Sequence, residues 1–333
     1  LSSKAATEAA SGATDLWDQV APRALSFRLG GPKQYAARGS DGLQAAGYRM
    51  ALGLIGSIVA RRGNLVPGAD IEELHQFRVS SRRLRASLRA TRPAFGREAL
   101  APLSEAVRDM TRETNAVRDL DVMLEAFQGF SAPRRAPDLW RHMLADRDER
   151  ERNMHAALSG AAFERFQREA KAFLDGFHPQ RHPTAEKWAR RRVRDAAPAL
   201  VRRGLRRVLA HQDGVSAGVE ESLHDLRLDC KRLRYTSELL GAGIDGIKDA
   251  VVRPVKAMQE SLGDWNDAEV HGAYVARYAE SSEGNSRDAG ALRDLVEDNA
   301  RKKRRALQTF HGQWSEFIDG NPDDPGSDPT PVR

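Results

Sequence analysis

Residues 74–85 read LHQFRVSSRRLR, and the same pattern returns at residues 223–234 as LHDLRLDCKRLR. Both copies begin with Leu-His, place an arginine three residues after the histidine, and close with Arg/Lys-Arg-Leu-Arg. The copies stand about 150 residues apart, which is the length of a subdomain and far too long for a short solenoid unit. We therefore expect two pseudo-equivalent halves produced by an internal duplication.

Each copy has the spacing of an amphipathic helix. At about 100° per residue, the cations and the histidine fall on one narrow stripe, and the leucines gather on a neighbouring face. The apolar face must pack, and the stripe beside it must meet water or anions. The stripe comprises His75, Arg78, Arg82, Arg85 and Arg89 in the first copy and His224, Arg227, Lys231 and Arg234 in the second, and Arg83 and Arg232 belong to the same motif.

The first stripe contains no acidic residue. Solvated helix faces usually mix both signs of charge at i,i+4 spacing, so a purely cationic line favours an anionic ligand over a merely solvated face. The second stripe is shorter, because Glu238 stands where the first copy has Arg89.

The paired His-x-x-Arg-x-x-x-(Arg/Lys)-Arg-x-Arg helices resemble the CHAD family, the conserved-histidine α-helical domain, over roughly residues 40–318. The resemblance implies two four-helix bundles around a basic central pore that binds inorganic polyphosphate. It also implies a cytoplasmic location at polyphosphate granules. The first residues resemble the segment that follows a CYTH domain, so a CYTH domain upstream in the full-length protein is a further expectation.

Composition indicates the class of protein but says little about its ligand. A chain of 333 residues can form two domains with their own cores, and 40% hydrophobic content is ordinary. No apolar run approaches the ~20 residues of a membrane helix, so Met50–Ala60 is interpreted as a buried helix. The single cysteine, Cys230, excludes an internal disulfide and lies on the apolar face of the second motif. With 53 basic and 47 acidic residues the net charge is only +6, so its distribution matters more than its total.

The predicted fold is all-α, with two pseudo-symmetric four-helix bundles and a basic surface or pore between them. The first motif helix should run to Arg92 and stop at Pro93. Other helices are expected near 40–62, from 97, and near 136–175, 184–211, 219–242, 246–281 and 286–318. The predicted segments are an irregular N-terminal segment 1–39, a first half 40–178, a linker 179–183, a second half 184–318 and a disordered acidic tail 319–333.

Cations on adjoining helices would widen the basic surface. Arg108 and Lys256 occupy corresponding positions in the two halves. The expected helix 184–211 is basic at its beginning and apolar at its end, so its first turns could reach an anion while its last turns pack. The additional predicted ligands are Arg49, Arg108, Lys187, Arg191, Arg194 and Lys256.

Three other chemistries fit less well. The histidines stand beside arginines and have no His or Cys at i+4, which disfavours a metal site. A phosphohistidine phosphotransfer domain would need an in-line donor and usually a metal held by carboxylates. Nucleic acid is the main alternative, but single-stranded binding normally adds aromatic side chains, which are only 6% of this chain. We predict non-catalytic, cofactor-free binding of inorganic polyphosphate through a channel lined by Arg, Lys and His, with weak nucleic-acid binding and no membrane partner.

Overall fold

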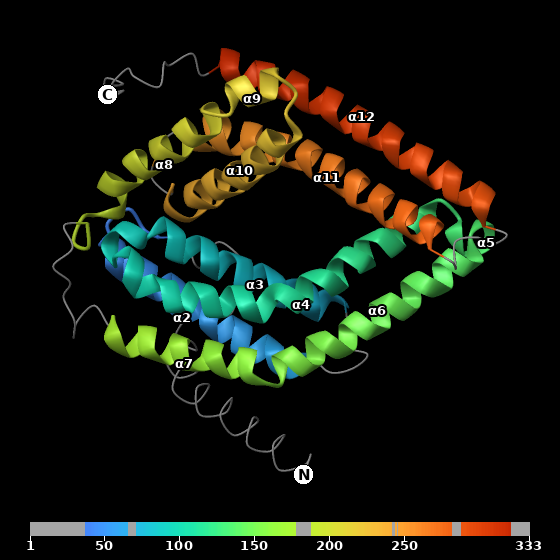
Figure 1. Cartoon of the computed structure of the whole chain (residues 1–333). Helices are drawn as coiled ribbons and strands as arrows, with labels where there is room; N and C mark the ends of the chain where they lie inside the picture. The colour runs from blue at the N-terminus through green and yellow to red at the C-terminus, as the bar shows by residue number, and fades with distance from the viewer. Residues whose placement is uncertain are drawn as a thin grey trace, which may run out of the picture. The chain divides into compact units, whose positions relative to one another are not determined.

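A computed structural model describes residues 37–65, 71–177, 188–241, 244, 246–281 and 288–320 (Figure 1). Every named element in these ranges is a helix, which confirms the predicted all-α class. The predicted segment up to residue 36, the linker 179–183, Lys187 and the tail beyond residue 320 lie outside the described residues. The elements are α2 (Leu43–Asn64), α3 (Ile71–Ala90), the 3-10 turn η2 (Arg92–Ala94), α4 (Arg97–Gly129), α5 (Ala132–Arg135), α6 (Pro137–Leu158), α7 (Ala161–Gly176), α8 (Val193–Leu209), α9 (Gln212–Ser216), α10 (Glu220–Leu240), the π-helical turn η3 (Lys248–Val252), α11 (Arg253–Glu280) and α12 (Ala289–Asp319).

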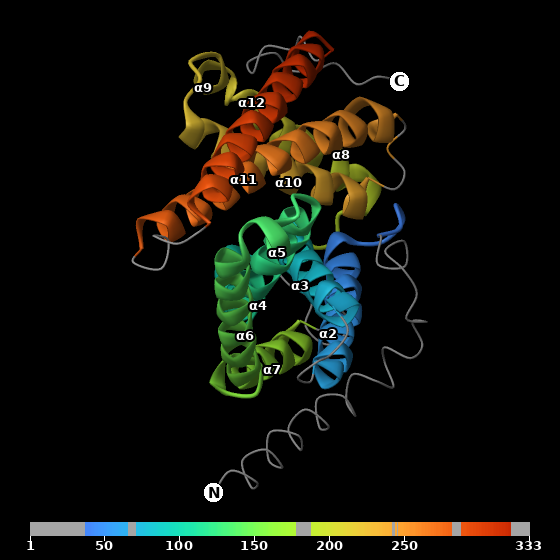
Figure 2. The ribbon, with the colours of Figure 1, turned by 90° about the vertical axis from the view of Figure 1, so that its right-hand side faces the viewer.

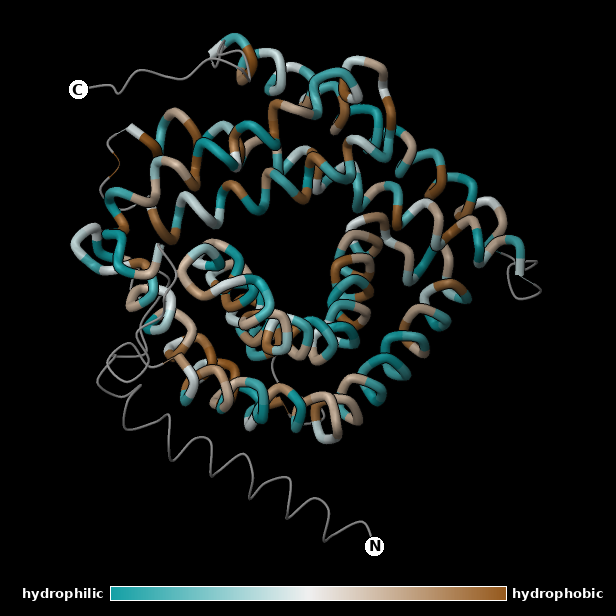
Figure 3. The backbone as a smooth tube through the Cα atoms, turned by 60° about the vertical axis from the view of Figure 1, so that its left-hand side comes forward, coloured by the Kyte–Doolittle hydropathy of each residue, from teal (hydrophilic) through white to brown (hydrophobic). Residues whose placement is uncertain are grey.

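The two motif stretches lie on α3 and α10, as predicted. Hydrophobic and hydrophilic residues alternate turn by turn along the helices, which is the pattern of helices with one packed face (Figure 3). Two expected helices differ from the structure. The helix expected at 136–175 is divided into α6 and α7, because Gly160 has an extended backbone (φ −125°, ψ −156°) that interrupts the helical hydrogen bonds.

The helix expected at 184–211 begins only at Val193. The preceding backbone is bonded instead to the start of α2: the amide of Leu43 donates to the carbonyl of Arg191 at 2.9 Å, and that of Val193 donates to Asp41 at 2.8 Å. An isolated antiparallel bridge joins Gly42 to Arg192 at the same place. These long-range bonds use groups that a longer α8 would have needed for its own first turn.

The helices form two compact units that are each discontinuous in sequence. Unit 1 takes the described parts of residues 1–124 and 143–197, and unit 2 takes those of 125–142 and 198–333. The units therefore divide within α4, α6 and α8. The repeat boundaries 40–178 and 184–318, and the two-bundle symmetry, stay predictions from the sequence.

The core of unit 1 is built around α2, which is buried along most of its length. By length and composition α2 could span a membrane, but 78% of its most apolar stretch is covered within the protein. This confirms the expectation of a buried helix around Met50–Ala60. Phe77, Leu84 and Leu88 of α3 are likewise buried. Gly47 lets α2 pack closely against the turn that follows α3, since a Cβ on Gly47 would lie 2.7 Å from Thr91 Oγ1.

The core of unit 2 joins α8, α10, α11 and α12. The last two run side by side (Figures 1 and 2). Leu226, Cys230 and Leu233 of α10 are fully buried in this core, as the motif's apolar face predicts. Burial, with the adjacent charge of Asp229, raises the pKa of the Cys230 thiol to about 12.

Residues 125–142, which come from the predicted first half, belong to unit 2. The Phe127 ring meets His271 edge-on at 5.7 Å between ring centroids. The buried Asp288 carboxylate accepts hydrogen bonds from the backbone amides of Asp138 (2.8 Å) and Leu139 (3.0 Å). Asp288, which precedes α12, therefore caps the first turn of α6.

Candidate anion-binding site

The basic stripe of α3 lies against α4 within unit 1. The Arg78 guanidinium donates a hydrogen bond to the backbone carbonyl of Thr114. Burial lowers the pKa of Arg78 to about 10, an effect that the nearby Asp119 carboxylate partly offsets. Because a buried guanidinium must keep a hydrogen-bond partner, this contact fixes the stripe against α4.

Two turns further along α3, Arg85 faces a second arginine. Burial lowers the pKa of Arg85, and the positive charge of Arg108 on α4 lowers it further. Arg108 Nε lies 3.7 Å from an oxygen of Asp109, a carboxylate that Arg112 and Arg165 also contact. The positive charge of the Arg85–Arg108 pair is therefore only partly compensated. A bound anion would stabilise the charged form of both guanidinium groups.

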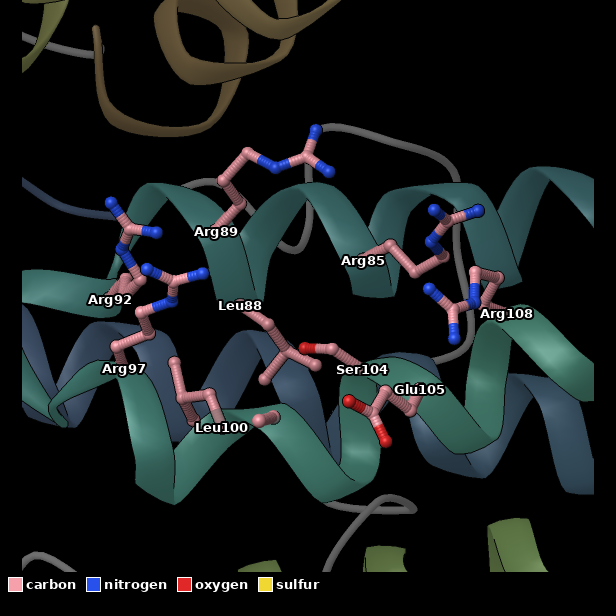
Figure 4. Close-up of a pocket in the computed structure, with 10 residues that line it drawn as sticks. Arg85, Leu88, Arg89, Arg92, Arg97, Leu100, Ser104, Glu105 and Arg108 are labelled. Carbon is pink, nitrogen blue, oxygen red and sulfur yellow. The ribbon is translucent and has the colours of Figure 1, made fainter.

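Arg85 and Arg108 line one end of a pocket of about 250 Å³ between the end of α3 and the beginning of α4. Arg92 and Arg97 stand at the other end, and Arg89 projects from α3 between the two pairs (Figure 4). The lining residues are Arg85, Leu88, Arg89, Arg92, Arg97, Leu100, Ala101, Ser104, Glu105 and Arg108.

The charge balance of this pocket is strongly positive. Five of its ten lining residues are arginines, and Glu105 is its single acid. A guanidinium nitrogen of Arg165, outside the pocket, lies 3.3 Å from the Glu105 carboxylate, so that negative charge is shared with another cation. Each arginine offers a planar fork of donors that stays charged at physiological pH, which suits anions with several oxygens.

A tight turn brings Arg97 opposite Arg92. After α3 ends, the amide of Gly96 donates to the carbonyl of Arg92 at 3.0 Å, and Gly96 has φ 87°. Glycine takes this left-handed conformation without the Cβ clash that other residues suffer. The motif helix was predicted to run to Arg92 but ends at Ala90, and Pro93 lies in the 3-10 turn that follows. Arg92 and Arg97 were not predicted as ligands. The available signal was one arginine on each side of a Pro-and-Gly turn.

The remaining predicted cations of unit 1 divide into two groups. Arg82 and Arg89 are exposed on the stripe, with the half-buried His75 at its start, and Arg83 occupies another face of α3. Of this first group only Arg89 lines the pocket, and none of the second group does. Arg49 pairs with Asp41, Arg194 Nε lies 3.8 Å from Asp195, and the Arg191 guanidinium lies 4.8 Å from the centre of the Trp188 ring.

The positive charge of the α10 stripe and its neighbours in unit 2 is compensated by acidic residues more fully than that of the α3 stripe. His224 is exposed, and Arg227 and Lys231 are half-buried. Arg234 Nε lies 3.5 Å from Glu238, and its guanidinium lies 4.9 Å from the centre of the Tyr235 ring. Two predicted ligands are engaged by acids: Lys256 Nζ lies 3.4 Å from Glu260, and Arg232 donates to Asp229 at 2.7 Å.

Comparison with known proteins decides the family. The CHAD domain profile matches residues 50–276. The chain belongs to the CHAD domain family. This confirms the resemblance read from the paired motif, whose two copies both lie inside the matched region.

The curated relatives of this CHAD domain have no assigned function. Uncharacterized proteins from two strains of Mycobacterium tuberculosis, CDC 1551 and H37Rv, are 28% identical to it over 254 residues. The match covers 71% of this chain and 47% of each relative, so the chain spans about half the length of these proteins.

Two solved structures share the fold. The crystal structure of the CHAD domain from the plant Ricinus communis gives a TM-score of 0.62 at 22% identity, covering 84% of this chain and 94% of that one. PptA from Streptomyces chartreusis gives a TM-score of 0.51 at 17% identity, covering 79% and 98% respectively. The CHAD fold of this chain thus positions the α3 stripe and its pocket on a shared helical framework.

Proposed function

We propose that this CHAD domain binds inorganic polyphosphate without converting it chemically. The observation that carries the proposal is the α3–α4 pocket, in which five arginines and one already shared carboxylate surround about 250 Å³. Polyphosphate carries negatively charged oxygens at every unit and no bases. A surface of forked donors therefore matches its whole length.

The pocket composition favours polyphosphate over nucleic acid. Its uncharged lining residues are Leu88, Leu100, Ala101 and Ser104, with no aromatic ring among the residues that line it. Binding of single-stranded nucleic acid usually gains about 1–3 kcal/mol per stacked base from aromatic side chains. A pocket of this kind can hold phosphates but offers no aromatic ring on which a base could stack.

A fuller form of the proposal is a channel in which one polyphosphate chain contacts both basic stripes. Its support is the sequence repeat, which provides the second stripe on α10. Linked contacts act at high effective concentration, so neutralising Arg227, Lys231 and Arg234 together should sharply weaken binding of long chains. If the two stripes bind independently, this triple variant should leave the affinity of the α3 stripe for polyphosphate unchanged.

In this proposal the domain acts as a targeting module. Binding by charge and hydrogen bonds needs no nucleophile, metal or cofactor, so the protein would gather at polyphosphate granules in the cytoplasm rather than process the polymer. The CHAD family membership and the arginine pocket support this role.

A competition measurement tests the proposal. Labelled long polyphosphate is bound to the protein and displaced at one salt concentration by unlabelled polyphosphate, RNA or duplex DNA. We expect polyphosphate to displace the probe at the lowest phosphate concentration. Equal displacement by all three would identify a generic basic surface and overturn the proposed function.

A further inference from the structure

Helix α8 carries a second concentration of arginines, outside the pocket and the two motif stripes. Arg202, Arg203, Arg206 and Arg207 are all exposed, and they occupy about one and a half helical turns. None of the four has a hydrogen-bond or ion-pair partner among the described residues.

Several other exposed cations have an acid three or four residues away on the same helix: Arg150 Nε lies 3.0 Å from Asp146, and Lys302 Nζ lies 2.8 Å from Asp298. On α8 the i,i+4 positions are instead Arg202 with Arg206 and Arg203 with Arg207. Like charges at this spacing destabilise a helix, so the arrangement works against folding.

The opposite side of α8 fixes which way the arginines point. Val201 and Val208 are buried in the core of unit 2. A Cβ on Gly204 would lie 2.9 Å from Leu233 of α10, so the two helices are closely packed there. Most of the apolar side of α8 is thus covered, which leaves too little of it to enter a lipid bilayer as an interfacial helix requires.

The arginine face lacks most of the groups that usually accompany arginine at nucleic-acid sites. Residues 198–210, PALVRRGLRRVLA, contain no aromatic, amide or hydroxyl side chain. Arginine alone can contact guanine, but recognition of adenine and binding of single strands normally use amide and aromatic side chains as well. What remains is a row of forked cations suited to closely spaced phosphates.

We propose that the arginine face of α8 is a second binding surface for polyphosphate, so that one protein molecule bridges two chains. The identity of the anion rests on the proposed function, whereas the location of the surface rests on α8 alone. A domain with two such surfaces would crosslink long polyphosphate as well as attach to it.

The experiment compares three four-residue variants with wild type. The α8 variant changes Arg202, Arg203, Arg206 and Arg207 to Gln, and the pocket variant changes Arg85, Arg89, Arg92 and Arg97 to Gln. The matched control changes Arg141, Arg150, Arg301 and Lys302 to Gln, which removes as many exposed cations, all of them paired with acids on their own helices. Fluorescence anisotropy reports binding of short polyphosphate, and energy transfer between donor-labelled and acceptor-labelled long chains reports bridging.

We expect wild type and the control to bridge long chains. The α8 variant should keep the affinity of the pocket for short chains, while its bridging of long chains falls at least about tenfold because the second contact is lost. Its unfolding midpoint should be no lower than that of wild type, since like-charge pairs are removed. Unchanged bridging in the α8 variant, or equal loss in the control, would overturn the inference.

The two proposals fail differently. Wild type that binds short chains without bridging long ones would leave the proposed function standing and reject the α8 surface. Absence of polyphosphate binding in wild type would reject both. If the α8 variant loses affinity for RNA while its bridging of long polyphosphate stays at the wild-type level, the face serves nucleic acid and the inference is wrong.

Discussion

Arg85 of α3 is partly buried and lies close to Arg108 of α4, so that burial lowers the pKa of Arg85 and the charge of Arg108 lowers it further. The buried Leu88 and Leu100 line the same pocket and hold the two helices together beside this pair. The fold therefore bears a repulsion that a bound anion would remove. A site built for an anion has this property, whereas a purely structural arginine is normally paired with an acid.

Replacing Arg108 by Gln should separate stability from binding. Without ligand, the free energy of unfolding should rise by roughly 0.5 kcal/mol, because a like-charge contact is relieved. Polyphosphate affinity should fall, because a donor is lost. Denaturant titration and anisotropy measure the two effects. Arg112→Gln, which removes a cation paired with Asp109 at 3.1 Å, is the control and should not stabilise the protein.

Salt dependence should reveal which arginines contact phosphates. Each phosphate contact releases counterions, so Arg92→Gln or Arg97→Gln should flatten the plot of log affinity against log salt by up to ~0.7–0.9 per contact, as in nucleic acids. Arg301 pairs with Asp298 at 3.2 Å outside the pocket, so Arg301→Gln should leave the slope nearly unchanged. Matching slopes in the three variants would exclude the pocket as the binding site.

Gly96→Ala should weaken binding without removing any charge. The left-handed φ of 87° would cost a residue with a Cβ about 1–2 kcal/mol, and relief of that strain would move Arg97 away from Arg92. We expect lower stability and lower polyphosphate affinity together. Gly63→Ala is the control: a Cβ there meets nothing within 4 Å, and alanine should stabilise the end of α2. Wild-type affinity in Gly96→Ala would show that the turn does not position Arg97.

Asp288→Ala should destabilise the protein by about 1–2 kcal/mol, because the first amides of α6 lose their cap. Asp294→Ala should cost less than ~1 kcal/mol, because its 2.5 Å pair with Arg135 is exposed to solvent. Denaturant unfolding of both variants measures the difference. Equal costs would mean that the Asp288 cap contributes no more than a surface ion pair.

The Cys230 thiol should be inert in the folded protein. Burial raises its pKa to about 12, whereas an unfolded thiol ionises near ~8.5. The folded state therefore holds this proton more tightly, and its stabilising contribution is complete below pH ~8.5 and is lost as the pH rises toward 12. The free energy of unfolding should fall more steeply above pH ~9 in wild type than in Cys230→Ala. Rapid labelling of the native thiol at pH 9 would contradict this environment.

Helical spacing alone predicted most of the helices and the residues that share their faces. Spacing of 3.6 residues per turn places Leu226, Cys230 and Leu233 on one side of α10 and the cations beside them. The core burial of these three residues confirms that reasoning. The paired motif also identified the family, because both copies can be read without knowing what they touch.

Which cations remain available to a ligand depends on contacts in the folded chain. Arg78 meets the carbonyl of Thr114 on α4, and Arg49 meets Asp41, through contacts that no helical period predicts. The beginning of α8 was decided in the same way, by backbone bonds from residues 39–44 to residues 189–194. The Arg92–Arg97 pair required the turn at Gly96, whose direction no helical period encodes. Periodicity describes one helix at a time, whereas a pocket depends on long-range distances between helices that only the folded chain sets.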